Sequence, residues 1–281
     1  MKLCNIIVDG SGHVAVVTDR GIVDATASGL DFSIDEIIAG NGIDEIARIA
    51  GDVTLPVLQE NEVTFGRILN NPDKIVCVGL NYSEHANNCG EKPFETPTLF
   101  SKFSDSLSAA NSDVVLPKHE NSFDYEAELV IVIGRRARSV GIDQAHDYIF
   151  GYASGNDLSC RAAQLRTTQW LIGKALPDFA PCGPYVVTAD EYDPSEPKYV
   201  RSWVNGELKQ NGLTSHMVFN CEELVSYASR YINLNPGDLI FTGTPSGVII
   251  EKKREDRVWL RAGDVVEVEV EGLGKLRNRL V

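Results

Sequence analysis

The stretch FDYEAELVIVIG at residues 123–134 decides the fold, because its long apolar run predicts a β-strand buried on both faces. Side chains alternate along a strand, so Glu126 and Glu128 share one face, about 6–7 Å apart along the chain. Val130 and Val132 continue the same face, which is therefore partly apolar. Two like charges held there need either raised pKa values or a cation between them. All-oxygen ligands favour Mg²⁺ or Mn²⁺ over zinc, whereas a solvated strand face is the simpler interpretation.

The overall composition is that of an ordinary globular protein, with 281 residues, 43% hydrophobic and 23% charged. The net charge of −14 repels a phosphate backbone, so we expect no nucleic-acid partner. The six cysteines form no C-x-x-C pair, which predicts free thiols and a reducing, cytoplasmic location. No apolar stretch approaches about 18 residues, so no membrane span is expected.

Two unequal domains are predicted. Residues 1–68 form a small N-terminal α+β domain, with strands near 3–8, 13–18 and 22–26. A helix is expected to begin after Ser33 and to run toward Ala50, interrupted by glycines. The turn sequence Asn-Asn-Pro-Asp at 70–73 marks the boundary, and a domain over 72–281 follows.

The second domain is predicted to be rich in strands and to carry two helices, one over about 160–168 and one from about 220 to before 235. The expected strands are 74–79, 123–134, 184–188, 199–204, 238–242, 247–250 and 265–270. This order indicates an α+β fold without regular βαβ alternation. The usual motifs of ATP-driven, dinucleotide-dependent, zinc-protease and serine-hydrolase enzymes are absent.

Several polar residues are candidates for chemistry. His85 follows a predicted strand and could be a general base, although a surface histidine is the commoner case. Asp157 could be a third oxygen ligand or a helix N-cap. Arg161 and Gln164 lie one helical turn apart and could hold a substrate carboxylate, or simply form a solvated helix face. Lys102 lies within an apolar run, where it needs an anionic partner unless it reaches solvent.

Six sequence blocks, taken in order, resemble the fumarylacetoacetate hydrolase superfamily over about residues 72–281, near its 2-hydroxyhepta-2,4-diene-1,7-dioate isomerase, acylpyruvase and oxaloacetate decarboxylase branch. These blocks are GLNYSEH (79–85), FSKF (100–103), DYEAEL (124–129), NDLSCRAAQ (156–164), QWLIGK (169–174) and FTGTPSGV (241–248). The resemblance implies a strand-rich catalytic fold, described as a mixed β-sheet roll, preceded by the small N-terminal domain.

The resemblance also implies roles for individual residues. Mg²⁺ or Mn²⁺ would be bound by Glu126, Glu128 and Asp157. Catalytic roles fall to His85 and Lys174. The substrate-binding positions would be Tyr82, Lys102, Arg161, Gln164 and Thr244. Members usually pair as homodimers and act on small molecules, so a homodimer without nucleic-acid or membrane partners is expected.

The activity implied first is hydrolysis of C–C bonds in small acylpyruvate-like or fumarylacetoacetate-like 1,3-diketo acids, through an enolate stabilised by the metal. The alternatives are oxaloacetate decarboxylation and keto–enol tautomerisation or isomerisation of 2-oxo diacids, and, after these, a non-catalytic metal- or metabolite-binding role. One position departs from many relatives, because Asn88 stands where a glutamate would complete a dyad with His85. This departure counts in favour of tautomerisation and decarboxylation, which depend less on a charged dyad. The polar segment 82–95 is predicted to be a lid over the site.

Overall fold

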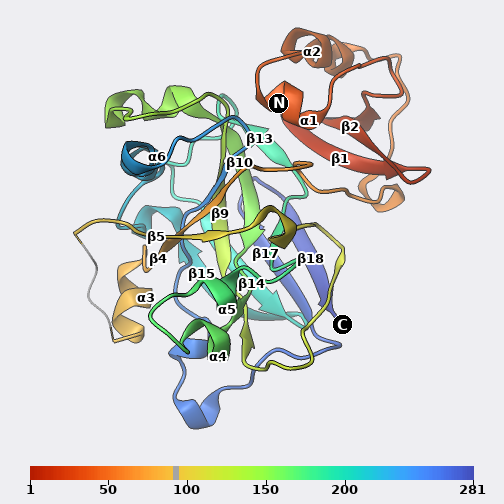
Figure 1. The fold of residues 1–281 in the computed structure, drawn as a ribbon. Helices are drawn as coiled ribbons and strands as arrows, with labels where there is room; N and C mark the ends of the chain where they lie inside the picture. Colours follow the sequence, from red (N-terminus) through yellow and green to blue (C-terminus); the bar gives the residue numbers. More distant parts are fainter. Residues whose placement is uncertain (91–94) are drawn as a thin grey trace.

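The structure, a computed structural model, describes residues 1–90 and 95–281. A large sheet of eleven strands crosses the molecule (Figure 1), with the order β3-β2-β1-β13-β10-β9-β16-β4-β5 and with β12 and β6 attached through β10. Its strands are β1 (Lys2–Val8), β2 (Ser11–Thr18), β3 (Gly21–Asp24), β4 (Ile75–Gly79), β5 (Thr98–Lys102), β6 (Leu107–Ala109), β9 (Ala127–Ile133), β10 (Ile149–Asn156), β12 (Ala180–Cys182), β13 (Val186–Thr188) and β16 (Leu239–Phe241).

A second sheet of five strands has the order β15-β14-β17-β18-β7, and β8 pairs with β11 as a separate ribbon. These strands are β7 (Asp113–Val114), β8 (Phe123–Asp124), β11 (Ser159–Cys160), β14 (Tyr199–Val204), β15 (Glu207–Leu213), β17 (Val265–Val270) and β18 (Lys275–Leu280). The turn between β14 and β15 is Asn205-Gly206, where both residues have positive φ, as a two-residue hairpin requires.

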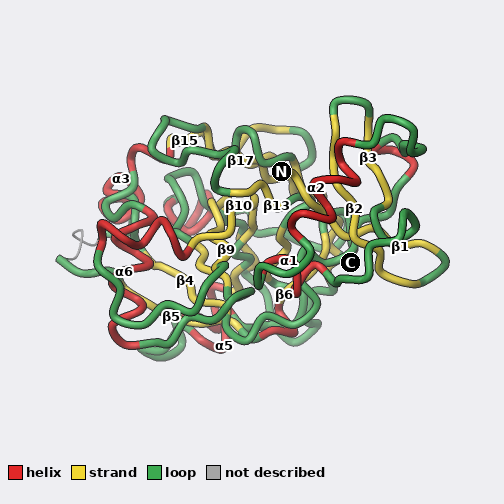
Figure 2. The backbone as a smooth tube through the Cα atoms, turned by 90° about the horizontal axis from the view of Figure 1, so that it is seen from above, coloured by secondary structure: helices red, strands yellow, loops and turns green. Residues whose placement is uncertain are grey.

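The helices are short and lie around the sheets (Figure 2). They are α1 (Ile34–Ile38), α2 (Ile43–Gly51), α3 (Ser83–Asn88), α4 (Arg161–Gln164), α5 (Leu171–Lys174) and α6 (Cys221–Tyr231), with 3₁₀ turns at Glu60–Glu62, Ser104–Ser106, Ile142–Tyr148, Thr214–His216, Ile249–Glu251 and Arg254–Asp256. Within the described residues, no helix has the length and apolar character needed to cross a membrane.

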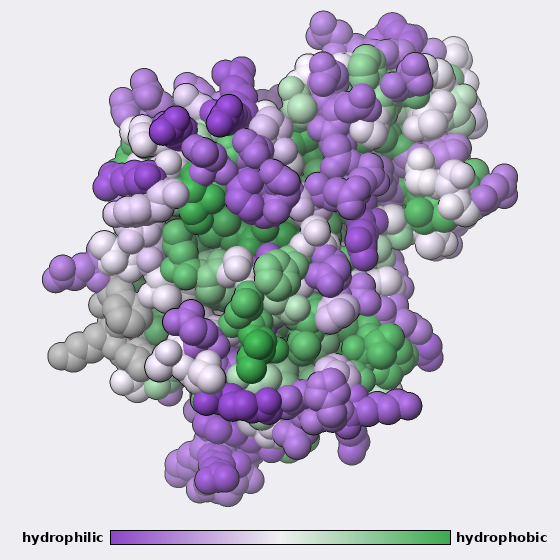
Figure 3. All heavy atoms as spheres, viewed as in Figure 1, coloured by the Kyte–Doolittle hydropathy of each residue, from purple (hydrophilic) through white to green (hydrophobic). Residues whose placement is uncertain are grey.

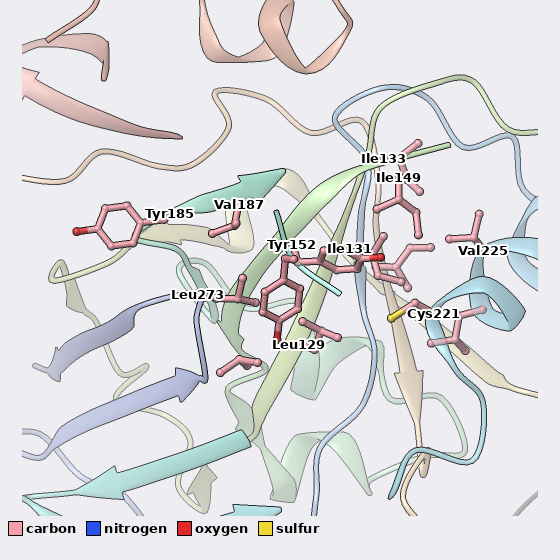
Figure 4. Packing of buried hydrophobic residues seen from close by; sticks show 14 of the residues in the cluster. Leu129, Ile131, Ile133, Ile149, Tyr152, Tyr185, Val187, Cys221, Val225 and Leu273 are labelled. Carbon is pink, nitrogen blue, oxygen red and sulfur yellow. The ribbon is translucent and has the colours of Figure 1, made fainter. Parts of the chain in front are cut away.

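The core is built on β9, whose seven residues are all buried. β9 is paired on both edges, with β10 and with β16, and apolar side chains cover its faces. Figure 4 shows one such face, where Leu129, Ile131 and Ile133 pack beside Tyr152 and Leu273. Because β9 has paired edges and covered faces, its backbone is a rigid support for Glu126, which directly precedes the strand, and for Glu128, its second residue.

The strand-rich α+β fold is confirmed, and so are the strands near residues 3–8, 199–204 and 265–270. Three predicted elements were wrong in detail. The strand over 123–134 is interrupted at Tyr125 and Glu126, where the chain leaves β8 and enters β9. The helix over 160–168 spans only Arg161–Gln164. Residues 247–250 form no strand, because the segment turns into a 3₁₀ helix over Ile249–Glu251.

The N-terminal segment lies at one side of the molecule in Figure 1, where β1 extends the large sheet by pairing with β13. A boundary between residues 68 and 72 stays a prediction. The predicted lid over 82–95 begins with α3, and its residues 91–94 lie outside the described part of the chain.

Candidate metal centre and active site

Strand register brings three carboxylates together. The antiparallel pair β9–β10 sets Asn156 opposite Ala127, so the next residue, Asp157, lies beside Glu126 and donates its backbone N–H to the Glu126 carbonyl at 2.9 Å. Glu128 enters from β9 on the same side. One oxygen from each of the three carboxylates lies within 4.8 Å of the others, and all three residues are buried. The group predicted from sequence is therefore assembled by the pairing of two central strands.

Three buried cations surround this group. Lys174 Nζ bridges Glu126 Oε2 at 2.6 Å and Asp157 Oδ2 at 2.8 Å. Lys102 Nζ lies 2.8 Å from Asp157 Oδ1, and Arg161 Nη2 donates to Glu126 Oε1 at 2.6 Å. Burial opposes ionisation of Glu126, but Lys174 and Arg161 outweigh it and hold the pKa of that carboxyl well below its usual range.

Glu128 differs from its two neighbours, because it makes no ion pair with any described residue. Its Oε2 accepts one hydrogen bond, from the backbone N–H of Gly243 at 2.8 Å. Burial, and then the negative charges of Asp157 and Glu126, raise the pKa of Glu128 well above its usual value. A buried carboxylate next to two others has a high free-energy cost unless a further positive charge is present.

Counting the buried charges shows how large the deficit is. Four carboxylates face three cations: Asp124, Glu126, Glu128 and Asp157 against Lys102, Arg161 and Lys174. A divalent cation among the three converging carboxylates would turn one excess negative charge into one excess positive charge. The donor set consists of oxygen atoms alone, which suits a hard ion such as Mg²⁺ or Mn²⁺. The residues present therefore fit a divalent metal.

His85 has a carboxylate partner that the sequence did not reveal. Its Nδ1 donates to Glu251 Oε1 at 2.5 Å, and both side chains are largely buried. Burial lowers the pKa of His85, but the hydrogen bonds with Cys89 and Glu251 outweigh this effect and raise the pKa to about 9. Asn88, expected to leave the histidine without a dyad, lies 3.4 Å from Glu251 Oε2 through its Nδ2. The dyad carboxylate thus comes from the segment after β16.

Asp124, a second residue that sequence reasoning missed, links Arg161 to the segment that carries Glu251. Its Oδ2 accepts hydrogen bonds from Arg161 Nε at 2.8 Å and from the Ile250 N–H at 3.0 Å. Its Oδ1 accepts from the Ile249 N–H at 2.9 Å. The same carboxylate therefore orients the arginine that holds Glu126 and the 3₁₀ turn that presents Glu251. It lies in the DYEAEL block, where its burial could have been suspected from the strand pattern.

A cavity of about 460 Å³ connects these groups. It is lined by seven residues singled out from the sequence, namely His85, Glu126, Glu128, Arg161, Gln164, Lys174 and Thr244. The Thr244 hydroxyl already donates to the Ala127 carbonyl at 2.8 Å and accepts from Gln210, so it anchors the loop after β16 to β9. Gln164 accepts from Arg161 Nη1 through its Oε1 at 3.0 Å, which leaves its Nε2 as a donor.

Tyr82 and Lys102, predicted to bind substrate, do not line this cavity. The Lys102 ammonium is enclosed by the carbonyl oxygens of Leu158 (3.0 Å) and Phe179 (2.8 Å) and by Asp157. Tyr82 is buried directly before α3, and its carbonyl accepts the Ala86 N–H in the first turn. Their positions favour support roles: Lys102 holds Asp157, and Tyr82 begins the helix that carries His85.

Several known proteins are similar to this chain. The family model "Fumarylacetoacetate (FAA) hydrolase C-terminal" matches residues 74–281. The human protein named "Oxaloacetate tautomerase FAHD2A, mitochondrial" is 40% identical over 239 residues, which cover 84% of this chain and 75% of the relative.

Two solved structures share the fold. Fumarylacetoacetate hydrolase from Exiguobacterium antarcticum superimposes with a TM-score of 0.86 and 31% identity, covering 100% of this chain and 99% of the other. Fumarylpyruvate hydrolase from Pseudomonas aeruginosa, solved in complex with Mn²⁺ and pyruvate, has a TM-score of 0.68 and 33% identity, with coverage of 75% and 90%.

The role of Asp124 can be tested by Asp124→Asn. The amide group turns a donor toward Arg161 Nε or the Ile250 N–H, so a buried ion pair is broken and a hydrogen bond is lost. We expect the free energy of unfolding in urea to fall by about 3–5 kcal/mol. Asp113→Asn is the matched control: it breaks a half-exposed pair with Arg279 and should cost under about 1 kcal/mol. Equal losses in the two variants would contradict this account.

The pH dependence of stability tests the pair of His85 and Glu251. A histidine whose pKa rises on folding contributes stability that is complete below its unfolded value near 6.5. This contribution disappears as the pH rises through about 9. In the metal-free protein, Glu251→Gln should therefore cost on the order of 2 kcal/mol at about pH 6 and much less at about pH 9.5.

The control for this measurement is Glu222→Gln, which alters a glutamate 3.8 Å from the exposed His146. Its effect on the free energy of unfolding should be small at both pH values. A cost of Glu251→Gln that does not change with pH would show that the carboxylate does not stabilise a protonated His85.

Proposed function

This chain belongs to the fumarylacetoacetate hydrolase family and is an enzyme of that family, and we propose that it is a divalent-metal-dependent keto–enol tautomerase of small 2-oxo diacids such as oxaloacetate. The observation that carries the proposal is Glu128, which is buried beside Glu126 and Asp157, has no cationic partner among the described residues and lines the same cavity as His85. The activity named for the human relative supports this choice among the reactions open to the family.

The three carboxylates would hold Mg²⁺ or Mn²⁺, and the Mn²⁺ bound to the Pseudomonas aeruginosa relative supports this assignment. When bound, the cation would supply a Lewis acid that stabilises negative charge on the oxygens of a 2-oxo acid. Arg161 and Lys174 add fixed positive charge at the same end of the cavity, and Gln164 offers its free amide donor. These groups would hold the 2-oxo carboxylate end of the substrate beside the three residues that would bind the cation.

His85 moves the proton. Because Glu251 engages Nδ1, Nε2 is the nitrogen left to exchange a proton with a substrate in the cavity. In the direction from enol to keto, the protonated ring donates its Nε2 proton to C3 while the enol hydroxyl releases its proton to water, and the ring then regains a proton from the solvent. The reverse direction removes the C3 proton with the neutral ring and protonates the keto oxygen from water. Glu251 stabilises the imidazolium and orients the ring.

Hydrolysis of a C–C bond in 2,4-dioxo acids is a second candidate, and the pair of His85 and Glu251 favours it. The missing dyad carboxylate had argued against hydrolysis, and Glu251 now supplies one. The same Nε2 could take a proton from water attacking the distal carbonyl. The two reactions differ in products, since hydrolysis releases pyruvate and a second carboxylic acid, whereas tautomerisation leaves the carbon skeleton intact.

The activity is tested by following the ultraviolet absorbance of the enol of oxaloacetate with and without Mg²⁺, and by product analysis with 2,4-dioxo acids. We expect faster enol–keto conversion that requires the cation. Glu128→Gln removes the charge that the cation needs, so the rate should fall by about 100-fold or more, and stabilisation by added Mg²⁺ should disappear. Glu269→Gln, at a partly exposed glutamate on β17, is the control and should keep both properties. Full activity in Glu128→Gln would refute the proposal.

We also propose that the chain forms a homodimer, as the family resemblance implies, and that it resides in the cytoplasm. Light scattering after size-exclusion chromatography should give about twice the chain mass of 30.8 kDa. A mass equal to one chain over a range of concentrations would contradict the dimer.

A further inference from the structure

The cavity contains a cation that the proposed chemistry does not use. Arg257 lines it together with Ile250 and Glu251, on the segment after β16. That segment, blue at the foot of Figure 1 and hydrophilic in Figure 3, mixes the cations Lys252, Lys253 and Arg254 with the acidic residues Glu251, Glu255 and Asp256. The charges of the segment therefore nearly cancel, and attraction for an anionic ligand rests on Arg257 itself.

In the part of the chain that the structure describes, Arg257 has no carboxylate partner, unlike Lys174, Arg161 and His85 in the same cavity. Lys174 and Arg161 each contact two carboxylates, and His85 contacts Glu251. Arg257 forms no ion pair with residues 1–90 or 95–281. It is half-buried, and an arginine in that environment remains charged.

Two hydrogen bonds fix the guanidinium in place. Its Nε donates to the Lys252 carbonyl at 2.9 Å, and its Nη2 donates to the Ile250 carbonyl at 2.7 Å. The ring of Trp259 lies 5.8 Å from the guanidinium carbon. Within the described residues, Nη1 has no partner, and Nη2 keeps a second proton. The arginine therefore presents pre-organised donors suited to a carboxylate.

We propose that Arg257 binds the distal carboxylate of the substrate and thereby makes the site selective for 2-oxo diacids over 2-oxo monoacids. The inference rests on the proposed function, which places the 2-oxo carboxylate end at Glu126, Glu128 and Lys174. A diacid has a second carboxylate, and Arg257 is a cation of the cavity that pairs with no carboxylate of residues 1–90 or 95–281. The cavity of about 460 Å³ is large enough for diacids longer than oxaloacetate.

The test measures the affinity of the Mg²⁺-loaded protein for ligands matched in length, by calorimetry: 2-oxobutyrate against oxaloacetate, and 2-oxovalerate against 2-oxoglutarate. The wild type should prefer the diacid in at least one pair. Arg257→Met should weaken diacid binding by about 10- to 100-fold and leave the monoacid nearly unchanged. Arg257→Lys keeps the charge but loses the planar donor pair, so its affinity for the diacid should lie between that of the wild type and that of Arg257→Met. Arg254→Met, at the exposed neighbour, should change neither affinity.

The outcomes separate the two proposals. If the wild type binds monoacid and diacid equally, or if Arg257→Met weakens both to the same degree, the arginine only holds its loop and the inference is overturned, while the proposed function stands. If the wild type binds none of these 2-oxo acids in the presence of Mg²⁺, the proposed function itself fails.

Discussion

The site depends on the electrostatic cost of one carboxylate, that of Glu128. It lies on β9, whose seven residues are all buried, with Glu126 and Asp157 beside it, and among the described residues its one hydrogen-bond donor is the Gly243 N–H. The antiparallel register of β9 and β10 leaves the three acidic groups no room to separate. A divalent cation held there would remove the repulsion and would supply the positive charge that the proposed 2-oxo acid substrate requires.

The rest of the site is arranged around that group by connections between distant segments. α3 follows β4, and the turn with Glu251 follows β16; these two strands pair in parallel, so both segments leave the sheet at the same end. Asn81 links the ends by donating to the carbonyl of Thr242 at 2.7 Å. Asp124 then joins the turn to Arg161. These contacts connect the pair of His85 and Glu251 with the three carboxylates, so the two groups are held in one arrangement.

These connections also explain how far the sequence could predict the structure. Alternation along one strand placed Glu126 and Glu128 together, and the apolar run after them indicated the core strand. The pairing of Glu251 with His85 could not be predicted, because the two residues lie 166 positions apart and no local pattern marks the glutamate. For Lys102 the sequence left open an anionic partner or a route to solvent, and it could not show that backbone carbonyls enclose the ammonium beside Asp157. The strand expected at 247–250 failed because Asp124 accepts two N–H groups of that segment and holds it as a turn.

The most direct measurement of the central claim is a crystal structure of the protein grown with Mn²⁺ and examined by anomalous diffraction. The account predicts one anomalous peak bounded by Glu126, Glu128 and Asp157, with an oxygen of each at about 2 Å. A map with no peak there at saturating Mn²⁺, or with the ion bound elsewhere while Glu128 stays protonated, would contradict it.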